Sequence, residues 1–124
     1  MPGKNLSCLG CSEKISVFTD DFVGGPYQVV NFVFGDYTRQ AGEHNGHAWY
    51  LKDDNPTIKL YAAQGGHYHI CPADTPDNTR TGWAYHTGDI TDCAEDTATD
   101  WSYWDQHLDM WVAAGTKLQV MGYN

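Results

Sequence analysis

Short runs of alternating apolar and polar residues recur along this chain, and turn-forming residues separate them. Ile15 and Val17 flank a serine, and residues 58–62 repeat the alternation with Ile, Leu and Ala on one side. A period of two residues is typical of a strand with one buried face. The dipeptide Asn45-Gly46 tolerates the positive φ angles of a tight hairpin turn. The pattern therefore predicts strands joined by short turns.

The other predicted strands extend this pattern over most of the chain. The segment Tyr27–Phe34 is apolar on both sides, as in a covered strand. Further strands are predicted at residues 37–39, 48–51, 67–71, 83–86 and 118–121. With 124 residues the chain suits one domain, so we expect residues 1–124 to form a single β-rich domain. The predicted fold is mainly β, a small antiparallel sandwich or open barrel in meander order.

One segment has the spacing of a helix instead. Trp101, Trp104, Leu108 and Trp111 recur at three- and four-residue steps, which would align them on one helical face. A capping residue precedes this segment and Gly115 follows it. The sequence therefore predicts one short helix near residues 100–111, packed on the sheet.

Four cysteines restrict the N-terminal segment. Cys8 and Cys11 form a C-x-x-C motif, whereas Cys71 and Cys93 lie far along the chain. A zinc site would need a second C-x-x-C, and a redox pair would need a strand–helix context. Two disulfides in an extracellular domain are favoured over these alternatives. We expect them to tie residues 1–13, as a leader, to the region of Cys71 or Cys93.

The charge balance excludes some partners. Acidic residues number 16 against 7 basic ones, and the formal net charge is -9. Nucleic-acid binding needs a basic stripe, so we expect no nucleic-acid partner. No apolar run is long enough for a membrane helix, so we expect no membrane insertion. The first residues carry no secretory signal, which leaves two alternatives: a cytoplasmic chain, or an extracellular one whose leader has been replaced by an initiator Met.

A series of short motifs resembles a known module. Gly35-Asp36-Tyr37-Thr38, Asn45-Gly46-His47-Ala48-Trp49-Tyr50, Leu60-Tyr61, Gly82-Trp83-Ala84-Tyr85 and Trp101 follow one another between residues 14 and 111. This order resembles small β-rich extracellular-type modules with the motifs G-x-Y-T, N-G-x-P-x-Y, L-Y, W-x-I and W. Ala48 stands where proline is usual, and Tyr68 stands where the W-x-I tryptophan would fall. The resemblance implies a β-rich, non-catalytic domain and assigns no functional residue.

Three histidines form a candidate zinc site. His67 and His69 alternate on one predicted strand, and His86 on the next strand could complete the set. With an open fourth position, such a site activates water for hydrolysis or hydration. Partly exposed strand histidines without a metal are the alternative that the residues favour.

An acidic segment is a candidate calcium site. Carboxylates at short spacing are the ligands that calcium prefers, although the segment lacks the order of an EF-hand and also suits a solvated surface. The sequence establishes no cofactor with certainty, and calcium is the candidate cofactor that it suggests. The candidate calcium ligands are Asp89, Asp92, Glu95, Asp96 and Asp100.

Aromatic residues exceed what a small core needs. The chain has 5 Trp, 8 Tyr and 4 Phe, so some rings are expected at the surface. Indoles and phenols beside Asp and Asn suit sugar rings, and they also suit a protein partner. The candidate ligand-binding residues are Trp49, Tyr50, Tyr61, Tyr68, Trp83, Tyr85, Tyr103 and Trp104.

The function predicted from these features is binding without catalysis. The first hypothesis is a secreted, lectin-like module that recognises carbohydrate through Trp and Tyr, with calcium as a candidate aid. The second is a structural subunit of an extracellular assembly, which meets itself or a partner protein through aromatics. A small three-histidine metalloenzyme is a third, weaker hypothesis.

Overall fold

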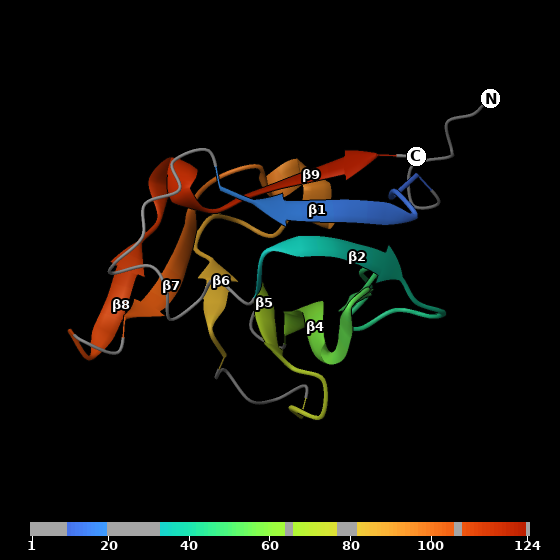
Figure 1. The fold of residues 1–124 in the computed structure, drawn as a ribbon. Coiled ribbons are helices and arrows are strands. Elements are labelled where there is room, and N and C mark those ends of the chain that lie inside the picture. Colours follow the sequence, from blue (N-terminus) through green and yellow to red (C-terminus); the bar gives the residue numbers. More distant parts are fainter. Residues whose placement is uncertain (1–9, 20–32, 64–65, 77–81, 106–107, 124) are drawn as a thin grey trace.

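Nine antiparallel strands form one curled sheet, a half-barrel, in this computed structural model (Figure 1). The structure describes residues 10–19, 33–63, 66–76, 82–105 and 108–123. Consecutive strands pair from β1 to β8, and β9 returns to pair with β1. The strands are β1 Lys14–Phe18, β2 Gly35–Arg39, β3 Tyr50–Lys52, β4 Asn55–Ala63, β5 His67–Pro72, β6 Ala84–His86, β7 Trp101–Asp105, β8 Met110–Ala113 and β9 Gln119–Tyr123. This confirms the predicted mainly β class and its meander order.

The turn between β2 and β3 follows the sequence signal at Asn45-Gly46. Asn45 has φ 54° and Gly46 has φ 83°, in the left-handed region that Asn and Gly tolerate. His44 and His47 on either side exchange two backbone hydrogen bonds of 3.0 Å. The β2–β3 hairpin that the dipeptide predicted is therefore present.

The main core lies on one face of the sheet, which we call the core face; the opposite face is the outer face. Ile15 pairs with Tyr37, and Leu60 pairs with Ile70. These four residues have no exposed surface and belong to one hydrophobic cluster. Because side chains alternate along a strand, the polar neighbours of these residues fall on the outer face. The alternation read from the sequence therefore identifies the core face.

The helix predicted near residues 100–111 is wrong. Strands β7 and β8 occupy this segment and pair with each other as a hairpin. Trp104 lies directly opposite Trp111 across the pair, and Leu108 lies in the connection with 61% of its surface exposed. The helix-like spacing arose because the turn joins two strands whose tryptophans face each other, not because one helical face carries them.

Short 3-10 turns supply the helical structure of the described residues. They are η2, Ala94–Thr97, and η3, Gly115–Lys117. No helix within these residues is long and apolar enough to cross a membrane. Most of the strand predicted at Tyr27–Phe34 falls in residues 20–32, outside the described part of the chain.

Candidate functional site

A disulfide joins the segment before β1 to the segment before η2. It links Cys11 and Cys93, which lie 82 residues apart in the sequence. This pairing agrees with the expectation that the leader is tied down near Cys93. Cys8 lies outside the described residues, and Cys71 is buried beside Tyr61 on the outer face. The second disulfide stays a prediction.

The three predicted zinc ligands do not come together. The register pairs His69 with Tyr85, so the side chain beside His69 on the outer face is Tyr85. His86, one residue later, lies on the core face against Trp101, with ring centroids 5.8 Å apart. Among the described residues, the imidazoles of His67, His69 and His86 do not converge as a metal-ligand set. His86 falls on the opposite face because the register places Tyr85, and not His86, opposite His69.

The predicted calcium ligands are dispersed in the same way. Glu95 uses one carboxylate oxygen to accept hydrogen bonds from the backbone N–H and hydroxyl of Ser12. Within the described residues no three of the acidic side chains bring their oxygens together. The exposed members of the set are Asp89, Asp92, Asp96 and Asp100.

Half of the predicted ligand-binding aromatics are buried. Tyr50, Tyr61 and Tyr68 have no exposed surface, and Tyr103 is 3% exposed. The Tyr50 hydroxyl donates to the Ser12 carbonyl at 2.8 Å, and the Tyr68 hydroxyl donates to the Thr91 carbonyl at 2.8 Å. Burial raises the pKa of both phenols, so they remain neutral donors. These four rings stabilise the interior and cannot contact a ligand at the surface.

The other four predicted aromatics are half-buried. Trp49 packs against Tyr61, and its indole N–H donates to the Ala41 carbonyl at 2.9 Å. Tyr85 and Trp104 lie on the outer face, where both contact Trp111 in edge-to-face geometry. The ring centroids lie 4.8 Å apart for Tyr85–Trp111 and 5.4 Å apart for Trp104–Trp111. Trp111, which contacts both rings, was not among the predicted ligand-binding residues.

Trp83, the fourth, lines an open hollow between the start of β4 and the end of β5. The volume of this Trp83 hollow is about 520 Å³. The indole packs on the main core and is half-buried, so part of it remains available in the hollow. Asp74 is exposed there. The full lining is Pro56, Thr57, Pro72, Ala73, Asp74 and Trp83.

Backbone and side-chain hydrogen bonds fix the walls of the Trp83 hollow. The Ala73 N–H donates to the Thr57 carbonyl at 2.7 Å, which joins the two walls. Asn55 accepts a hydrogen bond of 2.6 Å from the Thr57 hydroxyl. Trp83 donates its backbone N–H to the Ile70 carbonyl at 2.9 Å. The hollow is therefore largely pre-formed, as small-molecule sites usually are.

Sequence reasoning found Trp83 but missed the rest of the lining. Pro56 precedes the strand predicted at residues 58–62 and Pro72 follows the one predicted at residues 67–71, so each is typical of a strand end and neither indicates a binding site. Their meeting depends on the pairing of β4 with β5, in which Ile58 lies opposite Pro72. No local pattern shows that register.

Comparisons with protein-family models, with curated proteins and with solved structures found no match for this chain. The resemblance of its short motifs to small extracellular-type β modules therefore stays a prediction.

Proposed function

We propose that this protein is a secreted, non-catalytic module that binds carbohydrate in the Trp83 hollow. The observation that carries the proposal is the presence of an indole and a carboxylate, from Trp83 and Asp74, in one open hollow of about 520 Å³. Pockets for small ligands typically span roughly 300–1,000 Å³ and combine apolar walls with a few polar groups.

The lining suits the two kinds of surface on a sugar. The apolar face of a pyranose ring stacks on an aromatic plane such as that of Trp83, and Pro56 and Pro72 extend the apolar wall. Sugar hydroxyls donate to a carboxylate such as Asp74, and they can also donate to the Thr57 hydroxyl oxygen, whose own proton goes to Asn55. Glycoside hydrolysis uses two carboxylates, whereas Asp74 is the one acidic residue in the described lining, which favours binding. The Cys11–Cys93 disulfide is typical of an oxidising compartment and supports secretion.

A glycan array tests this proposal. We expect the protein to retain a defined set of glycans, Trp83→Ala to lose at least ten-fold in affinity for them, and Asp74→Asn to lose affinity too. Trp49→Ala is the matched control, because Trp49 is also a half-buried indole but does not line the hollow. Retention of no glycan, or equal affinity of Trp83→Ala and the parent protein, would contradict the proposal.

A chelator arm of the same array tests the predicted calcium aid. Loss of glycan retention with chelator, restored by added Ca²⁺, would support a calcium contribution from the acidic segment. Unchanged retention would remove calcium from the proposal and leave the Trp83 hollow as the site.

A second candidate function, self-assembly, is favoured by the two edges of the sheet. Within the described residues β8 and β9 are the edge strands. Met110 on β8 is 52% exposed, and Met121 on β9 is 49% exposed. Exposed apolar side chains on an edge strand favour pairing with another chain, whereas the net charge of -9 opposes it. Sedimentation over a concentration series distinguishes the two, because a monomer at every concentration would contradict assembly.

A further inference from the structure

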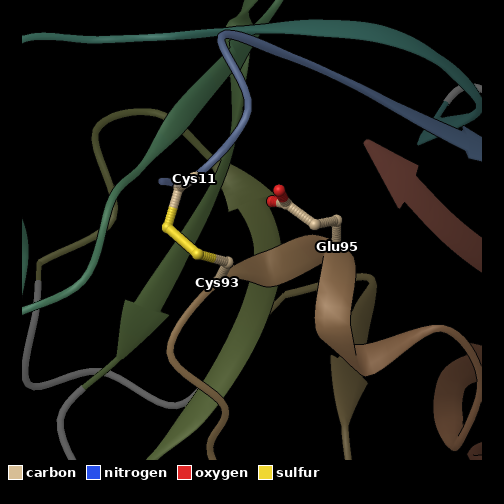
Figure 2. Close-up of side chains that lie close together, drawn as sticks. All are labelled: Cys11, Cys93 and Glu95. Carbon is tan, nitrogen blue, oxygen red and sulfur yellow. A yellow bond between two sulfur atoms is a disulfide. The ribbon is translucent and has the colours of Figure 1, made fainter. Parts of the chain in front are cut away.

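Two sulfur atoms and a carboxylate lie together where the N-terminal segment meets η2. The ligand atoms of Cys11, Cys93 and Glu95 all lie within 4.8 Å of one another. Figure 2 shows Glu95 extending from η2 toward the segment that carries Cys11, beside the disulfide. Thiolate sulfur and carboxylate oxygen are common zinc ligands in proteins. While the disulfide is intact, however, neither sulfur can act as a thiolate.

The two oxygens of Glu95 have different surroundings. Oε2 accepts hydrogen bonds from the Ser12 backbone N–H at 2.9 Å and from the Ser12 hydroxyl at 2.8 Å. Oε1 is buried and has no hydrogen-bond partner among the described residues. A buried carboxylate oxygen usually has a partner, so one without any calls for an explanation. Once the two sulfurs are reduced, Oε1 is therefore available to a cation, and Ser12 would keep the carboxylate in place through Oε2.

Contacts other than the disulfide also hold the segment that carries Cys11. Arg39 donates from Nη1 to the Cys11 carbonyl at 3.1 Å, and the Tyr50 hydroxyl donates to the Ser12 carbonyl at 2.8 Å. Both donors come from paired strands of the sheet. Cleavage of the disulfide therefore leaves Cys11 anchored close to Cys93 and Glu95. The Arg39 guanidinium also offsets the negative charge that two thiolates and a carboxylate would place there.

We propose that the reduced protein binds one Zn²⁺ through the thiolates of Cys11 and Cys93 and through Oε1 of Glu95, with water as the fourth ligand. A dithiol reductant supplies two electrons and two protons to the Cys11–Cys93 bond and is itself oxidised to a disulfide. When zinc binds, the two thiols release their protons to solvent. The same three side chains thus form a disulfide clamp under oxidising conditions and a zinc site under reducing ones.

Calorimetric titration with Zn²⁺ alone tests the proposal. The protein is first reduced with a trialkylphosphine, which takes an oxygen from water to become the phosphine oxide and is then removed under argon. A Cys8→Ser/Cys71→Ala background leaves only the thiols of Cys11 and Cys93. We expect this reduced background to bind one equivalent of zinc and the oxidised background to bind none. Adding Cys93→Ser to the reduced background should abolish binding.

Glu95→Gln is the decisive variant, because its amide oxygen can still accept the Ser12 hydrogen bonds while a neutral NH₂ replaces the zinc-binding oxygen. We expect it to weaken zinc binding by at least ten-fold. Asp96→Asn, at the exposed neighbouring carboxylate, is the matched control and should bind as tightly as the parent. Glu95→Gln and Asp96→Asn are also compared in the reduced protein with its natural cysteines, so the test does not require the Cys8→Ser/Cys71→Ala protein to fold. Equal zinc uptake by the oxidised protein, or an unchanged affinity in Glu95→Gln, would overturn the proposal.

Discussion

His86 is the residue whose burial has the clearest pH consequence. Its side chain lies on the core face against Trp101 and the residue is 4% exposed. Within the part of the chain that the structure describes, its Nδ1 has no hydrogen-bond partner. Burial lowers the pKa of His86 below its ordinary value of 6.5, and His67 lowers it further. Asp100 and a backbone hydrogen bond with Thr99 act in the opposite direction on this pKa. The folded protein therefore holds His86 neutral under conditions in which the unfolded chain protonates it.

We predict that the free energy of unfolding falls as the pH decreases below 6.5, since the unfolded state then binds a proton that the folded state does not. This one group contributes at most about 1.4 kcal/mol per pH unit. Urea unfolding between pH 7 and pH 5 measures the slope. His86→Phe keeps a ring against Trp101 but cannot bind a proton, so it should reduce the slope of the free energy of unfolding against pH. Identical slopes for the two proteins would show that His86 does not titrate between the two states.

The same residues show what a sequence reveals at this scale. Alternation placed His67 and His69 together on one face, and the structure agrees. The position of His86 depends on which residue of β6 lies opposite His69, and the hydrogen-bond register sets this. A shift of one residue moves a side chain to the other face. For that reason the strands could be predicted, while the three-histidine site could not.

At the scale of elements, the β7–β8 hairpin contributes Trp104 and Trp111 to the aromatic contacts of the outer face. Trp111 makes edge-to-face contacts with both Tyr85 and Trp104. Of these two contacts, Trp104 takes part only in the one with Trp111. Such contacts contribute roughly 0.5–1.5 kcal/mol each beyond the area they bury. We predict that Trp111→Ala lowers the free energy of unfolding by about 2–3 kcal/mol and Trp104→Ala by less. Chemical denaturation measures both.

Leu108→Ala is the control that distinguishes the hairpin from the helix that the spacing suggested. On a helix, Leu108 would pack in line with Trp101 and Trp104, and its truncation would be costly. In the hairpin it is 61% exposed, and its N–H donates to the Asp105 carboxylate at 3.0 Å, a contact that the substitution preserves. We therefore expect a change within roughly 0.5 kcal/mol. A large loss for Leu108→Ala would favour a helical packing instead.

The misassigned helix also shows the limit of periodicity. Four apolar positions at three- and four-residue steps fit one helical face, but they equally fit two short strands that reverse direction between Trp104 and Trp111. The β-forming composition of Trp-Ser-Tyr-Trp was the competing signal. The turn contains Asp109 with φ 56°, a left-handed position that no Gly or Asn marks in the sequence. Without a turn signal, the spacing favoured the wrong element.

For the whole molecule, the disulfide connects the start of the meander to the segment between β6 and β7. Cys11 precedes β1 and Cys93 follows β6, so the bond closes a loop with a sequence separation of 82 and encloses six strands. In the chain-entropy account, closing a loop of this length stabilises the folded state by about 4.5 kcal/mol. Such a contribution is comparable to the net stability of many domains. The spacing of the cysteines in the sequence could not predict this disulfide, because four cysteines allow three different pairings.

We predict that Cys11→Ala/Cys93→Ala lowers the free energy of unfolding by about 2–4.5 kcal/mol without changing the strand content, because Arg39 and Tyr50 still hold the N-terminal segment through backbone carbonyls. Thermal unfolding by far-ultraviolet circular dichroism measures both quantities. Arg39→Met in the same background removes one of these anchors and should destabilise the protein more than Arg39→Met does with the disulfide intact, since the clamp and the anchor hold the same segment. Strictly additive losses would show that the disulfide and the Arg39 hydrogen bond act independently, which would contradict the shared role.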